Sequence, residues 1–299
     1  MTTPDHPDLT DCLFHYTSTK GLIGILEERC VWATDASFLN DSSEIRYAGR
    51  ALQNHLESMI AELRLGNPAP GSIEAERLIR ITDAKEANVK FNEQEDAPPP
   101  LPPYVKDGAT YVSCFSEQPD ELSQWRAYGG RGYAVGFTRE GLGNLEIDGE
   151  DEPFKPAGQV AQVGYGQPVI DDLCQRVASY FARPDFLSLP RPSGLLDAVS
   201  FVLPALARVK HEAFKDELEW RVTVSRYARG PAKKLYFREG VRLVPYLKLR
   251  FDPSAVAWVF IGPGADIHDE RALRRFLEGN RYDLDRVWVE RSKAPFRGS

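Results

Sequence analysis

Runs of apolar residues suited to strands dominate the chain from Ala109 onward. The runs are short, rich in β-branched and aromatic residues, and bounded by turn-forming residues, which is typical of half-buried strands. This pattern predicts strands at 110–115, 132–137, 158–165, 218–225, 241–250, 255–261 and 286–290. The same reasoning predicts two strands near the start of the chain, at 13–16 and 30–34.

Helical spacing of apolar residues marks the segments between these strands. A short helix is predicted after the first strand, with Ser18 or Thr19 as its N-cap. Longer helices are predicted at 42–65, 72–91, 169–181, 194–214 and 268–277. The tract 94–103 is rich in proline, which removes backbone donors, so it is interpreted as an exposed loop.

Helices and strands are thus segregated along the chain rather than alternating, and this predicts an α+β fold. We expect one domain over residues 1–299 with mostly antiparallel strands. It would carry an N-terminal helical section at about 42–93 and a helical insert at about 166–214.

Composition narrows the class of protein. With 299 residues, 42% of them hydrophobic, the chain can bury a substantial core. No apolar run approaches the roughly 18–20 residues of a membrane span, and no secretory pattern is present, so we expect a cytoplasmic protein with no membrane partner. The net charge of −7 argues against broad binding to a phosphate backbone, although a local basic groove stays open.

Cysteine and histidine spacing gives no sign of a metal site. Cys12, Cys30, Cys114 and Cys174 are scattered without a CxxC pair, and the five histidines show no ligand spacing. We expect reduced thiols and no bound metal.

The segment 214–223 gathers charge on one predicted strand face. Successive strand side chains point to opposite sides, so Glu217, Glu219 and Arg221 would share one face, opposite Leu218, Trp220 and Val222. Two neighbouring carboxylates tend to push their pKa values apart, a source of acid or base behaviour. The alternative is a solvated face with an incidental ion pair.

Three other segments concentrate polar residues. His15 lies in an apolar strand that ends at a hydroxyl-rich turn, with Tyr16 and Thr17 beside it, although a strand histidine is also an ordinary core residue. Asn40 and Asp41 lie in a polar turn that could equally be a helix cap.

The third segment is centred on the strand at 110–115. Phe115 and Ser116 stand at its end, and Trp125, Arg126 and Tyr128 fall on about one helical turn before a glycine pair. Such a group could stack on a planar ring and bind phosphate, or it could pack a helix on the sheet.

Taken in order, these segments closely resemble a bacterial family catalogued as domain of unknown function 2971. The motifs that carry the resemblance read HYTS, LND with a glutamate three residues on, VSCFSE, QWRAYGG followed by GYAVGF, ELEWR, and WVFIGP. The resemblance covers about residues 13–290 and implies no particular activity.

The motif order is also similar to that of the ADP-ribosyltransferase superfamily. That resemblance implies that His15 holds the ribose attached to the nicotinamide of NAD, that Ser116 and Phe115 are the middle-strand residues, and that Glu219 binds the ribose 2′-hydroxyl. It further implies that Trp125 or Tyr128 stacks on the nicotinamide.

The two remaining charged residues of the strand face take their roles from the same resemblance. Glu217 would help to activate the acceptor, while Arg221 would keep the carboxylates ionised or contact a phosphate. The long helical segments are not core elements of the superfamily, and they could recognise the acceptor or fill the cleft.

We therefore expect an enzyme that consumes NAD as a substrate and transfers ADP-ribose to a protein or nucleic-acid acceptor, in the manner of a toxin or defence effector, with an antitoxin or defence partner as a further expectation. One alternative is a nucleic-acid-processing enzyme in which His15, Arg126 and Arg221 grip phosphate. The other is a non-catalytic module that binds a nucleotide or a partner protein.

Overall fold

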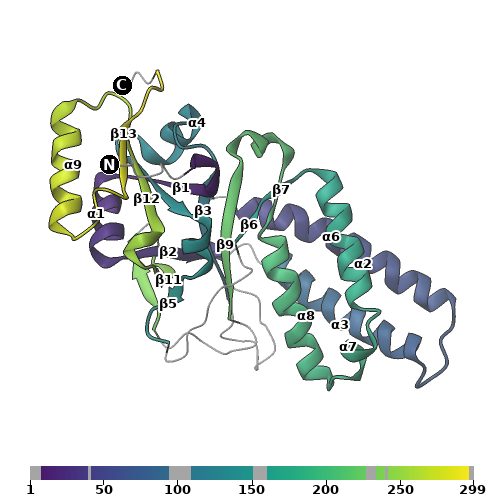
Figure 1. Ribbon diagram of the computed structural model, residues 1–299. Coiled ribbons are helices and arrows are strands. Elements are labelled where there is room, and N and C mark those ends of the chain that lie inside the picture. The colour runs from purple at the N-terminus through teal and green to yellow at the C-terminus, as the bar shows by residue number, and fades with distance from the viewer. Residues whose placement is uncertain are drawn as a thin grey trace.

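The computed structural model describes residues 8–39, 42–93, 109–150, 160–226, 234–239 and 242–295. In these ranges the chain forms a mixed α+β structure around a large, mostly antiparallel sheet (Figure 1). This confirms the α+β prediction. The proline-rich tract 94–103 and the residues Asn40 and Asp41 lie outside the described residues.

Eleven strands join the main sheet in the ranges given above. They are β1 (Cys12–Thr17), β2 (Cys30–Asp35), β3 (Thr110–Ser116), β4 (Tyr133–Thr138), β5 (Glu146–Ile147), β6 (Val160–Gln162), β9 (Glu219–Ser225), β10 (Tyr236–Arg238), β11 (Val244–Arg250), β12 (Val256–Ile261) and β13 (Trp288–Arg291). The pairing of β12 with β13 is parallel. A separate parallel pair is formed by β7 (Gly164–Tyr165) and β8 (Val209–Lys210).

Strand β3 joins two halves of the sheet. Along one edge it pairs with β9 over its whole length. Its other edge is shared, because β2 pairs near the start of β3 and β1 pairs at its last residue, where Phe14 lies opposite Ser116. The half with β10, β11 and β2 and the half with β1, β4, β12 and β13 therefore diverge from β3.

A hydrophobic core fills the space enclosed by these halves. Buried side chains from both contribute to one cluster, including Val31 and Leu249 from one half and Leu13 and Val259 from the other. Phe115 on β3 belongs to the same cluster. Apolar burial on this side thus holds the two halves of the sheet together.

The helices lie on both sides of the sheet. They are α1 (Thr19–Glu28), α2 (Ser42–Leu65), α3 (Ile73–Glu93), α4 (Leu122–Gln124), α5 (Arg139–Gly143), α6 (Gln167–Tyr180), α7 (Pro184–Ser188), α8 (Arg191–Leu206) and α9 (Ile267–Gly279). Short 3-10 segments are η1 (Leu9–Asp11), η2 (Ala36–Phe38), η4 (Glu212–Glu217) and η6 (Pro253–Ala255). A π-helical turn, η3 (Trp125–Gly129), follows α4.

Helices α2, α3, α6, α7 and α8 gather on the side of the sheet opposite α1 and α9 (Figure 1). We call this group the helical lobe. It has its own buried core, with Leu52 and Leu56 from α2, Ile81 from α3, and Leu173 and Val177 from α6. Segments predicted separately as a helical section and a helical insert thus pack together.

Local capping explains where some helices begin. The Ser18 hydroxyl accepts a hydrogen bond from the backbone of Gly21 at 3.2 Å, so Ser18 is the N-cap of α1. Asp266 and Asp269 form a reciprocal capping box at the start of α9.

Three predicted elements differ from the structure. The helix predicted at 194–214 ends at Leu206 and is followed by β8 and η4. The strand predicted at 158–165 is divided into β6 and β7, because Val163 between them bonds to Glu219 and Gly164 turns to pair with β8. Strand β11 begins at Val244 rather than 241, and β5 and β10 have no counterpart among the predicted strands.

Candidate functional site

The charged face of β9 is buried against the helical lobe rather than solvated. Glu219, Arg221 and Thr223 are exposed by 6%, 3% and 0%. On the opposite face, Val222 belongs to the core between the two half-sheets. The predicted alternation is therefore confirmed from Glu219 onward, and the interpretation as a solvated sheet face is wrong.

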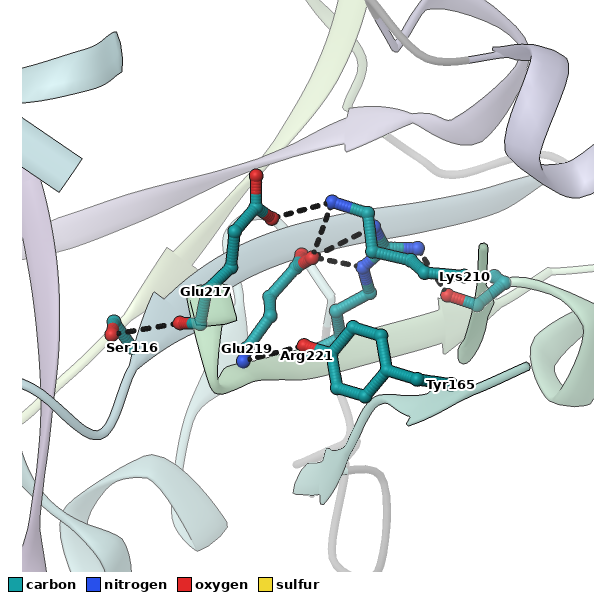
Figure 2. Close-up of polar contacts among 7 residues, drawn as sticks. Ser116, Tyr165, Lys210, Glu217, Glu219 and Arg221 are labelled. Atoms are coloured by element: carbon teal, nitrogen blue, oxygen red, sulfur yellow. Dashed lines mark hydrogen bonds and ion pairs between the residues drawn. The ribbon is translucent and has the colours of Figure 1, made fainter. Parts of the chain in front are cut away.

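The Glu217 carboxylate also lies at the charged face of β9, although Glu217 is not part of the strand. It is the last residue of the 3-10 segment η4, and Leu218 adopts a left-handed conformation with φ 44° before β9 begins at Glu219. The prediction that Glu217 and Leu218 lie on the strand is therefore wrong. The left-handed residue reverses the chain and still brings the Glu217 carboxylate beside that of Glu219 (Figure 2).

Both carboxylates bind the same ammonium group, that of Lys210 on β8. The Lys210 Nζ lies 2.7 Å from Glu217 Oε2 and 2.9 Å from Glu219 Oε2. Lys210 is 2% exposed, whereas the Glu217 side chain retains 20% exposure. Sequence reasoning missed Lys210 because it placed this position inside a helix.

Glu219 is also held by Arg221 two residues along the strand. The Arg221 Nε donates to Glu219 Oε1 at 2.6 Å and Nη2 donates to Oε2 at 3.1 Å. Burial by itself raises the pKa of the Glu219 carboxyl, but the charge and hydrogen bonds of Arg221 and the charge of Lys210 outweigh burial, so this pKa is lowered. The carboxylate is thus ionised at neutral pH.

Strand β7 and the helical insert that follows it hold this part of β9 through several contacts. The backbone N–H of Glu219 donates to the Tyr165 hydroxyl at 2.9 Å. Arg221 Nη1 donates to the carbonyl of Ala207, and Arg208 Nη2 donates to Thr223 Oγ1 at 2.8 Å. The charged strand face is therefore positioned by the insert as well as by the sheet (Figure 2).

His15 stands where β1 leaves β3. Its Nδ1 lies 2.9 Å from the carbonyl oxygen of Cys114. A carbonyl oxygen can only accept, so Nδ1 carries the proton and Nε2 is the acceptor of the neutral ring. Burial lowers the pKa of His15, which favours this neutral form.

Ser116 occupies the paired position between β1 and β9. It lies opposite Phe14 on one side and opposite Glu219 on the other. Its hydroxyl donates to the backbone carbonyl of Glu217 at 3.0 Å and accepts from the backbone of Gln118 at 3.1 Å. Ser116 therefore fixes the turn that carries Glu217.

These residues surround a cavity of about 160 Å³. Its lining combines aromatic rings with a few polar groups, the usual character of a small-ligand site. The lining residues are Phe14, His15, Tyr16, Leu39, Cys114, Phe115, Ser116, Gln124, Tyr128, Lys210, Glu217, Glu219 and Arg221. Eight residues singled out from the sequence line it, since His15, Tyr16, Phe115, Ser116, Tyr128, Glu217, Glu219 and Arg221 all appear in this set.

Trp125 does not supply a ligand surface in this structure. It is 0% exposed, its ring packs edge-on to Tyr16 with a centroid separation of 4.7 Å, and its indole Nε1 donates to Asp120 at 2.7 Å. Of the two stacking residues that the sequence suggests, Tyr128 lines the cavity and Trp125 does not. Arg126 and Thr17 are likewise absent from the cavity lining, and Arg126 is exposed.

Two other groups in the lining are protonated at neutral pH. Burial, followed by the nearby carboxylates, raises the pKa of Tyr128 to about 12. Burial also raises the pKa of the Cys114 thiol far above its ordinary value, and the charge of Glu219 adds to this effect. Neither the phenol nor the thiol is therefore suited to act as an anionic nucleophile.

Within the described ranges, no three His, Cys, Asp or Glu side chains gather in a way that could hold a metal ion. No helix in them is long and apolar enough to cross a membrane.

No model of a known protein family, no curated protein and no solved structure matches this chain. The resemblances to the bacterial family and to the ADP-ribosyltransferase superfamily therefore stay predictions.

Proposed function

We propose that this protein cleaves NAD at the bond between nicotinamide and ribose and transfers the ADP-ribosyl group to a protein or nucleic-acid acceptor. The observation that carries the proposal is the ionised, buried carboxylate of Glu219 in a cavity that it shares with Ser116 and His15. The three residues come from the adjacent strands β9, β3 and β1, in the motif order of the ADP-ribosyltransferase superfamily.

An ADP-ribosyltransferase-like scaffold is part of this proposal. Two half-sheets diverge from β3, and the cavity lies at the point of divergence, where His15 bonds to the backbone of β3. A split between strands gives an extended ligand access to side chains from both halves. The helical lobe is an addition to such a scaffold.

Glu219 supplies the electrostatic part of the reaction. When the bond from C1′ of the ribose to nicotinamide breaks, nicotinamide leaves with the bonding electron pair and positive charge develops on the sugar. A fixed carboxylate beside the sugar stabilises that charge more than it stabilises the bound substrate. Arg221 and Lys210 keep Glu219 ionised and oriented before the reaction begins.

Glu217 is placed to receive the acceptor's proton. The acceptor atom forms its bond to C1′ and loses a proton, which passes to the Glu217 carboxylate. Figure 2 shows one Glu217 oxygen turned toward Lys210 and the other turned away from it. The partial exposure of Glu217 suits contact with an incoming acceptor, whereas Glu219 is almost fully buried.

The cavity suits one end of NAD. At about 160 Å³ it has room for the nicotinamide ring, with the rest of NAD extending from it. The rings of Phe14, Tyr16 and Phe115 give apolar walls, and Tyr128, which is 50% exposed, gives a ring at the entrance. His15 Nε2 is an acceptor suited to a ribose hydroxyl.

The charge balance favours this reading over a phosphate-gripping site. The two cations of the cavity, Lys210 and Arg221, are already matched by Glu217 and Glu219. A polyanion in the cavity would have to compete with these internal carboxylates, and Arg126, proposed from sequence as a third phosphate contact, is not in the lining.

The first test is nicotinamide release from NAD by the wild type and by Glu219→Gln, with NAD binding measured in parallel. Glu28→Gln is a matched control, because Glu28 also accepts from a lysine, Lys248, but does not line the cavity. We expect release by the wild type and the control and at least a hundredfold slower release by Glu219→Gln. NAD binding without turnover in the wild type would favour a binding module, and no binding at millimolar NAD would contradict the proposal.

A further inference from the structure

Among the residues that line the cavity, Lys210 is the one that comes from the helical insert at about 166–214. Lys210 lies on β8, directly after the insert helices, and pairs through β8 with β7. Its aliphatic stem and ammonium are buried, with the Nζ 5.0 Å from the centre of the Phe214 ring. The ammonium therefore reaches the two glutamates from the side of the helical lobe.

Glu219 does not need Lys210 for charge neutralisation. Arg221 already binds both oxygens of the Glu219 carboxylate, at 2.6 Å and 3.1 Å. A guanidinium that donates to both oxygens of a carboxylate in this way forms a strong ion pair. The ammonium of Lys210 therefore matters chiefly for the second carboxylate, that of Glu217.

Glu217 is the carboxylate whose position depends on Lys210. It is on the 3-10 segment η4, outside the sheet, and its side chain is partly exposed. A glutamate there would be free to turn toward water, since like-charge repulsion from Glu219 opposes a position beside it. The ammonium bridges the gap, at 2.7 Å from one carboxylate and 2.9 Å from the other.

We propose that Lys210 is a positioning residue that holds the Glu217 and Glu219 side chains next to each other, so that the helical insert is a required part of the site. The geometric part of this inference stands on the contacts alone. The catalytic role of Lys210 rests on the proposed function, in which Glu217 receives the acceptor's proton. The position of Glu217 would then depend on the helical insert.

Apart from His15 in the same cavity, whose pKa burial lowers below 6.5, the other groups around the pair keep one protonation state over the carboxyl range. Burial raises the pKa of each of the hydroxyl or thiol groups that face the carboxylates, and Arg221 is a permanent cation. These groups are Cys114 from β3, Tyr128 from η3, Tyr165 from β7 and Arg221 from β9. A change in the carboxyl pKa values of Glu217 and Glu219 in Lys210→Met would therefore report the effect of the lost ammonium.

The experiment follows the side-chain carboxyl carbons of glutamate by NMR in the full-length protein through a pH titration without NAD. Signals are assigned with Glu217→Gln and Glu219→Gln. Lys210→Met is compared with wild type and with Lys248→Met, a control that removes a half-buried lysine from Glu28 away from the cavity. We expect Lys210→Met to raise at least one of the two carboxyl pKa values by a unit or more, a tenfold change in proton affinity, and Lys248→Met to change neither.

Unchanged titration of both glutamates in Lys210→Met would overturn the inference, and so would an equal change in Lys248→Met. If Lys210→Met does not fold, the double variant Lys210→Met/Glu217→Gln removes the repulsion along with the cation. A folded double variant supports the inference, whereas an unfolded one shows that Lys210 only stabilises the protein.

Nicotinamide release gives an independent second reading. With an active wild type, Lys210→Met should lower kcat about tenfold or more with a smaller effect on KM for NAD, and Lys210→Arg should recover part of the loss. A loss confined to KM, or no recovery with arginine, would contradict a positioning role. If the wild type releases no nicotinamide, the proposed function fails while the titration still decides the role of Lys210.

Discussion

Ser116 on β3 and Glu219 on β9 are directly paired across the sheet, and the Ser116 hydroxyl bonds to the backbone carbonyl of Glu217, two residues before Glu219. One serine therefore fixes the strand position of one carboxylate and the turn that carries the other. This relationship couples the sheet register to the geometry of the acidic pair, because a shift at the turn would move Glu217 away from Lys210.

Replacing Ser116 with alanine should loosen that turn. The change removes a donor to the Glu217 carbonyl and an acceptor for the Gln118 N–H, so we expect a loss of about 1–3 kcal/mol in the free energy of unfolding. Urea denaturation measures it. Ser123→Ala is the control, because that hydroxyl bonds to Glu121 at an exposed site, and an equal loss in both variants would show that Ser116 has no special role.

Glu219→Gln should change how stability depends on pH. The folded pKa of Glu219 lies below the ordinary 4.5, so its ionisation stabilises the fold above about pH 4.5, and this contribution is lost as pH falls through the folded pKa. In the variant the acid-induced loss of stability should be smaller. Arg221 and Lys210 would lose a charged partner, so we also expect about 3 kcal/mol lower stability at pH 7.

Denaturation curves recorded from pH 7 down to pH 3 test both parts of that prediction. Glu28→Gln again serves as the control, since its carboxylate lies in a more exposed pair. Parallel curves for wild type and Glu219→Gln would mean that the carboxyl is not held ionised by its neighbours.

The fold was predictable where local pattern and local structure agree. The short apolar runs of β3 and β12 and the helical spacing in α2, α6 and α9 carry their own signal, and their bounds agree to within a few residues. Ser18 was predictable as an N-cap for the same reason.

The site was predictable in part. Glu219 and Arg221 share a face because strand geometry fixes it, whereas Leu218 adopts a left-handed conformation that alternation does not reveal. Lys210 was hidden because β8 has two residues and is stabilised by its pairing with β7, not by its own sequence. Tyr165 on the two-residue strand β7, whose hydroxyl accepts a hydrogen bond from the Glu219 N–H, was hidden for the same reason. The available signal was Lys210 directly after Val209, seven residues before Glu217 of the ELEWR motif.

Tyr128 and Trp125 should behave differently toward a ligand. Tyr128 lines the cavity and is half exposed, so Tyr128→Ala should weaken NAD binding with little change in stability. Trp125→Phe should leave binding close to wild type but lower the free energy of unfolding by about 1–3 kcal/mol, because the buried indole donates to Asp120. Titration calorimetry and denaturation separate the two effects. Weaker binding in Trp125→Phe than in Tyr128→Ala would reverse these roles.

His15 allows a test that combines pH with ligand binding. The folded protein holds His15 neutral at pH values where the unfolded chain takes up a proton, because burial lowers the folded pKa below 6.5. The free energy of unfolding should therefore fall as pH drops below about 6.5, until the folded His15 is also protonated. His15→Asn can keep a donor to the Cys114 carbonyl but cannot titrate, so its stability should fall less over the same range.

The His15→Asn variant also lacks the Nε2 acceptor, and NAD binding should weaken at all pH values. His268→Asn, at an exposed position on α9, should retain wild-type binding. An unchanged pH dependence in His15→Asn would show that His15 is protonated equally in both states, and unchanged NAD binding would remove it from the ligand site.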